Sequence, residues 1–160
     1  MNITPVKLVD WNSDMQKFLK DLYYTELAFY RRYHRNGTNW LIHQYCIPLE
    51  WLSWLIFCFN FFEPTLLVFF IVVYYRLIAT PASNRAACTL LLLSGVAKLV
   101  SLSMSLNNSL IISGFMQINS WFVQVMIGHK FYENNSPGMF KKISLNSIVL
   151  SLLMTFESRT

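Results

Sequence analysis

Residues 86–127 read AACTLLLLSGVAKLVSLSMSLNNSLIISGFMQINSWFVQVMI, and this stretch decides the fold. It contains two apolar runs, 86–106 and 110–127, separated by the turn-forming residues Asn107-Asn108-Ser109. An α-helix needs about 20 predominantly apolar residues to cross a hydrocarbon layer about 30 Å thick. Two runs of this length with so short a connection predict a membrane-spanning helical hairpin.

A second pair of apolar runs precedes this hairpin. Glu63-Pro64 separates the run 40–62 from the run 65–79, and the polar segment 80–85 follows. We therefore expect four membrane spans. A last apolar run, 143–156, is short for a full crossing, so we expect a re-entrant or interfacial helix there.

The composition agrees with a membrane protein. Hydrophobic residues make up 54% of the 160 residues and charged residues only 13%, against roughly 25% charged in ordinary globular domains. The expected fold is all-α, a polytopic membrane helical bundle over residues 40–160. Residues 1–39 form a cytosolic, partly amphipathic region, in which we expect an interfacial helix from Trp11 to Arg35. Asn39 is then placed to cap the next helix.

Lys and Arg residues are concentrated on one side of this arrangement. Six precede the first apolar run, two lie in 76–85 and three lie in 130–142, whereas the two alternate turns contain none. Cytoplasmic loops of membrane proteins carry such an excess. We therefore expect a multi-pass protein with its N-terminus in the cytosol. The net charge of +5 then indicates contact with anionic lipid headgroups rather than nucleic acid.

All three histidines fall on the predicted cytosolic face. His34 and His43 flank the start of the first span, and His129 follows the fourth. Glu133 lies four residues after His129, on the same face if the helix continues. Imidazoles with a carboxylate are the ligands of non-haem Fe(II) oxygenases, but zinc and a purely structural role stay open on spacing alone.

Two further ionisable residues lie within apolar runs. Glu50 is near the start of the first span, and Lys98 is near the middle of the third. Ionisable groups inside membrane helices are functional candidates that need a partner. A Glu50–Lys98 pair is one interpretation, and interfacial or snorkelling side chains are the other.

The histidines lie within recognisable motifs. The segment 29–43, FYRRYHRNGTNWLIH, together with the segments 128–133 (GHKFYE) and Ser136-Pro137, resembles the membrane-embedded 2-hydroxy fatty acid dioxygenases of fungal alpha-oxidation. That family has a Y-x-x-Y-H segment, an asparagine followed four residues later by histidine, and a later G-H…E…P segment. The resemblance covers about residues 25–157.

The resemblance implies an endoplasmic reticulum enzyme that uses Fe(II) and O₂ to shorten a 2-hydroxy fatty acid by one carbon. The lost carboxylate leaves as an oxidised one-carbon product. By position, His34, His43 and His129 match the catalytic iron ligands, with Glu133 as a further ligand or a supporting residue. The candidate substrate contacts are Tyr30, Tyr33, Arg35 and Asn39.

The sequence also departs from the family pattern. Arg35, Gly37 and Gly138 replace the residues common in fungal members, and Trp121 and Gln124 stand one residue further from His129. On an α-helix, one residue is a rotation of about 100°. These departures motivate the alternative function of a non-catalytic lipid-binding or assembly protein that kept the fold. A channel or transporter is the least favoured class, because too few polar residues line the spans.

Overall fold

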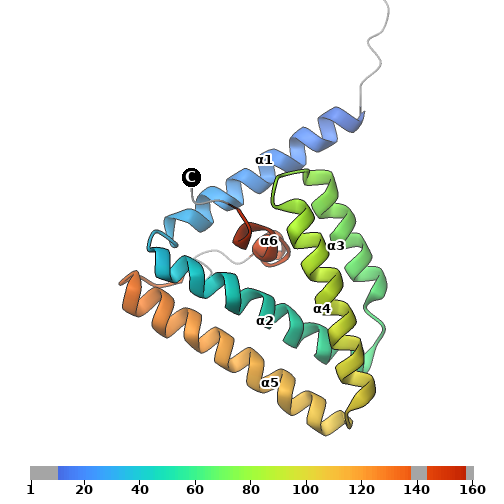
Figure 1. The fold of residues 1–160 in the computed structure, drawn as a ribbon. Helices are drawn as coiled ribbons and strands as arrows, with labels where there is room; N and C mark the ends of the chain where they lie inside the picture. The colour runs from blue at the N-terminus through green and yellow to red at the C-terminus, as the bar shows by residue number, and fades with distance from the viewer. Residues whose placement is uncertain (1–10, 138–143, 158–160) are drawn as a thin grey trace, which may run out of the picture.

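The computed structural model describes residues 11–137 and 144–157, and these residues form helices without any β-strand (Figure 1). In chain order the helices are α1 (Trp11–Arg32), α2 (Gly37–Phe61), α3 (Thr65–Ile78), α4 (Ser83–Ser103), α5 (Leu106–Phe122), the π-helix η1 (Val123–Tyr132) and α6 (Leu145–Thr155). The predicted all-α class is confirmed for this part of the chain. Gly138, one of the departures from the family pattern, lies outside the described residues.

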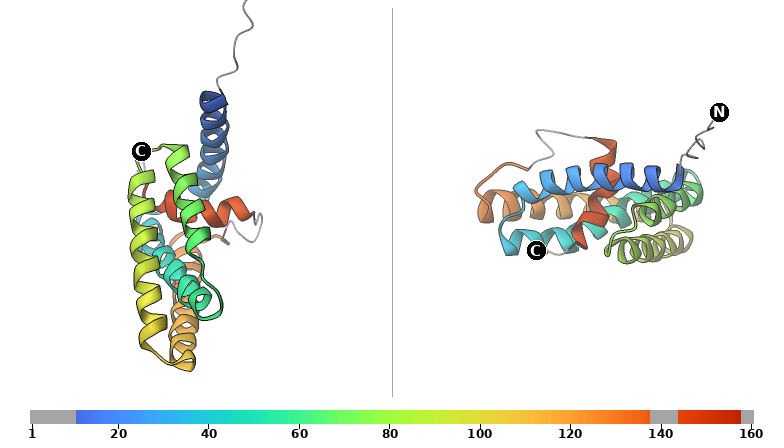
Figure 2. Two further views of the ribbon diagram at one scale, coloured as in Figure 1. Left: turned by 90° about the vertical axis from the view of Figure 1, so that its right-hand side faces the viewer. Right: turned by 90° about the horizontal axis from the view of Figure 1, so that it is seen from above.

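The helices form two antiparallel pairs set at an angle to each other (Figures 1 and 2). α2 packs against α5 and η1, and α3 packs against α4. α1 crosses the open side between the pairs and contacts α3 and α6. Figure 1 shows α6 end-on at the centre, and Figure 2 shows it running across the other helices.

The final apolar run is part of the core of the bundle. Leu150, Leu152 and Leu153 of α6 are fully buried. Hydrogen bonds tie α6 to two neighbours, from Trp51 Nε1 to Ser151 Oγ at 3.1 Å, from Gln44 Nε2 to the Thr155 carbonyl at 3.0 Å, and from Tyr75 Oη to the Val149 carbonyl at 2.5 Å. At a rise of about 1.5 Å per residue, the 11 residues of α6 are too short to cross a membrane.

Two helical segments are long and apolar enough to cross a membrane by length and composition. They are Ser83–Ser103, with mean hydropathy 1.8, and Leu106–Tyr132, with mean hydropathy 1.5. α3 has 14 residues, or about 21 Å of helix, which is less than the thickness of a hydrocarbon core. The four predicted spans each fall on an observed helix. In the described residues, two of these helices are long and apolar enough to cross a membrane.

The connection between α1 and α2 differs from the prediction in its cap. Asn36, not Asn39, is the N-cap of α2, and its side-chain oxygen accepts hydrogen bonds from the Thr38 and Asn39 amides at 2.8 and 3.4 Å. An N-cap side chain serves amides two and three residues ahead, which Asn36 reaches because α2 begins at Gly37. Asn39 is thereby left inside the first turn, where it is fully buried.

Candidate metal centre

The three histidines come together at one end of the bundle. The ring centroids are 4.2 Å apart for His34 and His43, 4.8 Å for His34 and His129, and 4.9 Å for His43 and His129. One ligand nitrogen from each ring lies within 4.8 Å of the other two. All three side chains are buried, between 2% and 7% exposed. The predicted cluster is confirmed, formed by the α1–α2 connection, α2 and η1.

Backbone carbonyls fix the orientation of two of these rings. His34 Nδ1 lies 2.7 Å from the Tyr30 carbonyl, and His43 Nδ1 lies 2.9 Å from the Asn39 carbonyl. A carbonyl oxygen only accepts hydrogen bonds, so Nδ1 is the protonated nitrogen in each ring. The lone pair is then on Nε2, the arrangement typical of histidines that bind metals.

The immediate surroundings of His34 favour its neutral form. The Tyr30 ring stacks on His34 with centroids 3.7 Å apart, and the Trp40 ring lies nearly perpendicular to His34 with centroids 6.5 Å apart. Burial holds the pKa of His34 well below its usual range, and nearby His43 lowers it further. His34 Nε2 and His129 Nδ1 are buried without hydrogen-bond partners in the described residues. Unpartnered buried nitrogens are costly unless they have a ligand.

Asn39 and Glu133 connect the segments that carry the histidines. Glu133 Oε1 accepts hydrogen bonds from the Asn36 amide at 2.5 Å and from Asn39 Nδ2 at 3.2 Å. Asn39 Nδ2 also donates to the Tyr33 carbonyl at 3.3 Å. The group of clustered ligand atoms in the described residues contains the three histidines without Glu133. In this structure the Glu133 carboxylate contacts the turn that positions His34 and His43.

The π-helix η1 lets two residues that are five apart face α2. On an α-helix, Gln124 and His129 would point about 140° apart. The wider i→i+5 winding of η1 brings both to the same cavity, as π-helical segments often do at functional sites. A hydrophobic period alone does not predict this winding.

The partner of Glu50 is Gln124 and not Lys98, the partner considered from the sequence. Gln124 Nε2 donates to Glu50 Oε1 at 2.6 Å, while Lys98 Nζ lies 3.2 Å from Glu63 Oε2. A Glu50–Lys98 pair is thus wrong. Lys98 is near the end of α4, next to the α2–α3 connection that carries Glu63, and Glu50 lies nearer the histidines.

The histidines line a cavity of about 390 Å³, within the size range of small-molecule sites. Its walls come from α1, α2, η1 with the end of α5, and α6. Of the four predicted substrate contacts, Tyr30 and Tyr33 lie in the wall, whereas Arg35 is exposed outside it and Asn39 is buried behind it. The Tyr30 hydroxyl is buried with no hydrogen-bond partner in the described residues.

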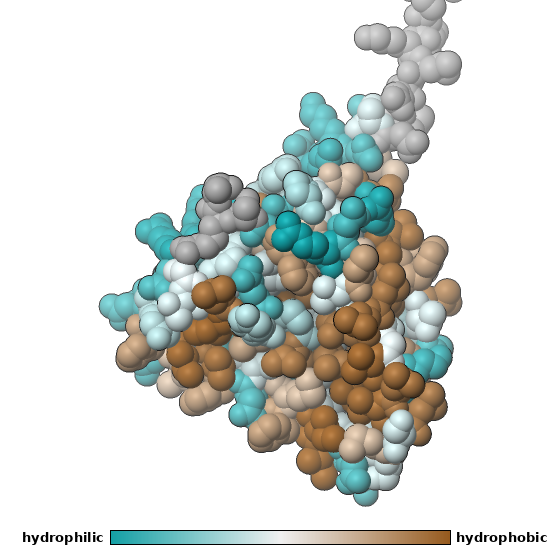
Figure 3. Space-filling model, in the orientation of Figure 1, coloured by the Kyte–Doolittle hydropathy of each residue, from teal (hydrophilic) through white to brown (hydrophobic). Residues whose placement is uncertain are grey.

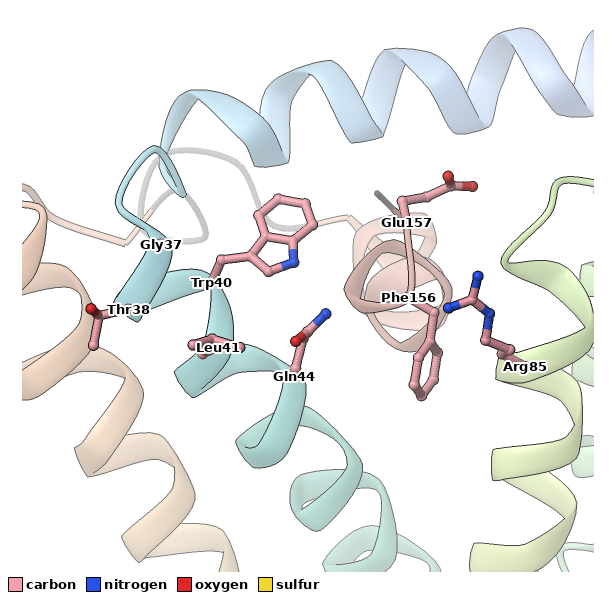
Figure 4. A pocket seen from close by; sticks show the side chains of 8 residues that line it. All are labelled: Gly37, Thr38, Trp40, Leu41, Gln44, Arg85, Phe156 and Glu157. Atoms are coloured by element: carbon pink, nitrogen blue, oxygen red, sulfur yellow. The ribbon is translucent and has the colours of Figure 1, made fainter. Parts of the chain in front are cut away.

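A second hollow opens on the other side of α2. Figure 4 shows it between the start of α2, Arg85 of α4 and the end of α6. Its volume is about 540 Å³, and no histidine lines it. Of these two hollows, the cavity with the three histidines is the one that holds a cluster of metal-ligand atoms from the described residues.

The donor set fits a divalent transition metal. Three imidazoles with oriented or unpartnered nitrogens suit iron or zinc and leave coordination positions for other ligands. The fold and site thus define an all-helical protein with a buried three-histidine centre. A family model for 2-hydroxy-palmitic acid dioxygenase Mpo1-like proteins matches residues 21–160, and the chain belongs to this family. No curated protein and no solved structure matches the chain.

Proposed function

We propose that the chain is an Fe(II)-dependent dioxygenase that shortens 2-hydroxy fatty acids by one carbon. The observation that carries this proposal is the cluster of three buried imidazoles in the wall of a cavity. Family membership supplies the substrate class and the type of reaction. A 2-hydroxy acid offers two adjacent oxygen groups, which suit a metal that keeps open positions.

The residues of the chain hold and shield the reacting groups. His34, His43 and His129 would hold the iron, which when bound supplies the chemistry that activates O₂. Glu133 and Asn39 keep the α1–α2 turn against η1, so that the imidazoles stay in register. Tyr30 stacks on His34 and forms part of the cavity wall. The mostly apolar walls of the cavity would limit the access of bulk water to the reacting groups.

We further propose that the chain lies in the endoplasmic reticulum membrane, with α2 to α5 crossing it and the histidines at the cytosolic surface. The bilayer would thin locally around the 14-residue α3. The apolar windows of α4 and of Leu106–Tyr132 are only 22% and 17% buried, unlike the core helices of soluble proteins. Figure 3 shows apolar side chains over much of one face and hydrophilic ones towards α1. Reciprocal hydrogen bonds of 2.9 Å join Ser53 and Ser113, as small polar residues do between membrane helices.

Cysteine labelling in sealed microsomes tests this topology. Asn84 is exposed at the start of α4, and Asn107 is exposed near the turn that joins α4 to α5, so the two residues lie at opposite ends of α4. In a chain whose native cysteines are replaced by serine, a membrane-impermeant maleimide should label Asn84→Cys at once. Asn107→Cys should react only after the microsomes are permeabilised. Equal labelling of both in sealed microsomes, or release of the chain by alkaline carbonate, would contradict four crossings.

Product analysis of the purified full chain tests the activity. With Fe(II), O₂ and 2-hydroxyhexadecanoate, the protein in lipid nanodiscs should form the fifteen-carbon acid, and ¹⁸O from labelled O₂ should appear in the products. Unsubstituted hexadecanoate is the matched control and should not be shortened. If the iron-loaded protein binds the hydroxy acid without shortening it, the non-catalytic lipid-binding function replaces this one.

A further inference from the structure

Besides the histidines, a pair of polar side chains, Glu50 and Gln124, lines the cavity. α2 contributes His43 and Glu50 to its wall, and η1 contributes His129 and Gln124. Glu50 and Gln124 are joined by the 2.6 Å hydrogen bond, and Gln124 also donates to the Ser120 carbonyl at 3.3 Å. The same two helices thus form two adjacent layers, one of imidazoles and one of a carboxyl with an amide.

Glu50 is not held there by a positive charge. Lys98, the basic residue within the apolar run 86–106, pairs instead with Glu63 towards the far end of α4. The hydrogen bond that the described residues give this carboxyl group reaches Oε1, from Gln124, and Oε2 is left for a ligand in the cavity that Glu50 lines. A carboxyl group within a membrane helix is costly, so its presence in a cavity wall points to a ligand.

Helix geometry directs this carboxyl group towards the metal centre. Glu50 is seven residues after His43, two turns along the same face of α2, with Ile47 between them in the cavity wall. Long side chains on a helix lean towards its N-terminus, here the end that carries His43. Tyr30, which stacks on His34, lines the same cavity as Glu50.

We propose that Glu50, held by Gln124, binds the 2-hydroxyl group of the substrate and so positions the carbon that reacts. This inference rests on the proposed function and names the residue that selects the substrate. A hydroxyl group both donates and accepts hydrogen bonds, so it pairs with Glu50 Oε2 whether the carboxyl is ionised or neutral. A substrate carboxylate, by contrast, can accept a hydrogen bond from Glu50 only when the Glu50 carboxyl group is neutral.

Sites that hydrogen-bond a substrate hydroxyl discriminate strongly against analogues that lack it, because the polar group of the protein then stays unpaired. The test is the ratio of the dissociation constants of hexadecanoate and 2-hydroxyhexadecanoate, measured on the metal-free full chain in nanodiscs by displacement of radiolabelled 2-hydroxyhexadecanoate. Without metal, the hydroxyl preference reports the protein side chains. The wild-type ratio should be about tenfold or more, as expected for a hydrogen bond to a charged group.

Glu50→Ala should lower this ratio to near one by weakening the binding of the hydroxy acid alone. Glu50→Gln keeps a donor and an acceptor and should retain most of the preference. Glu63→Gln is the matched control, because Glu63 is a carboxyl group outside the cavity, in the α2–α3 connection, where it pairs with Lys98 at 3.2 Å. It should leave the ratio unchanged.

Two results would overturn the role of Glu50. One is a wild-type chain without hydroxyl preference, and the other is a Glu50→Ala variant in which both acids lose affinity equally, as a structural role predicts. The proposed function fails separately. The wild-type chain can prefer the hydroxy acid and yet not shorten it when loaded with iron. That result would support the hydroxyl site and contradict the proposed reaction.

Discussion

Replacing His43 or His129 by alanine should abolish turnover and lower the affinity for Fe(II) by at least about 100-fold. Loss of a residue that only orients a ligand costs about 10–100-fold, so loss of a ligand itself should exceed that range. Both side chains are buried in the cluster, and neither substitution removes an apolar core residue. Product analysis and metal analysis after desalting measure the two effects on each variant, and circular dichroism checks that the variant is folded. An alanine variant that keeps its iron and its activity would show that its histidine is not a ligand.

Glu133 provides the matched comparison for this experiment. Its carboxylate accepts from the Asn36 amide and from Asn39 Nδ2. Glu133→Gln retains an accepting oxygen, so the variant should keep most of its iron if Glu133 orients the turn. Iron loss as severe as in His129→Ala would instead identify Glu133 as a direct ligand.

Gly128→Ala should destabilise the protein and disrupt the metal centre, although no ligand is changed. A β-carbon at Gly128 would overlap the Asn39 side-chain oxygen and would stand 3.5 Å from His43 Cε1. Asn39 is fully buried and held by its hydrogen bonds to Tyr33 and Glu133, so it has little room to move. Overpacking of this kind costs about 1–3 kcal/mol. Thermal unfolding and iron content should both fall.

Gly114→Ala is the control for this substitution. Gly114 lies in α5, in the same continuous helical segment, and a β-carbon there meets nothing within 4 Å. Alanine replaces glycine in a helix at no steric cost and with a higher helix propensity, so unfolding should be unchanged or slightly later. If Gly114→Ala and Gly128→Ala behave alike, the contact with Asn39 is not the cause of the loss.

The positions of the helices and the gathering of the histidines could be predicted from the sequence. Apolar runs bounded by polar turns identify the helices, because the hydrophobic effect acts on each run locally. His34, His43 and His129 were expected together because the charge bias assigns their three segments to one face. Both predictions use only the hydrophobicity and the charge of the individual residues, which are read directly from the sequence.

The pairing of Glu50 with Gln124 could not be predicted in the same way. It depends on the π-helical winding of η1, which places Gln124 where an α-helical period does not. The burial of α6 depends on hydrogen bonds to residues of α2 and α3 about 75 to 110 positions away. The cap at Asn36 was missed because the start of α2 differs by three residues from the expected one. Element boundaries of this kind are set by the local competition for caps.

X-ray absorption at the iron edge of the Fe(II)-loaded full chain in nanodiscs tests the central assignment most directly. We expect one iron per chain, with the outer-shell scattering pattern of imidazole rings from three histidines. Iron surrounded by oxygen scatterers alone, or a chain in which His34, His43 and His129 are all replaced and which still binds one iron, would contradict this assignment.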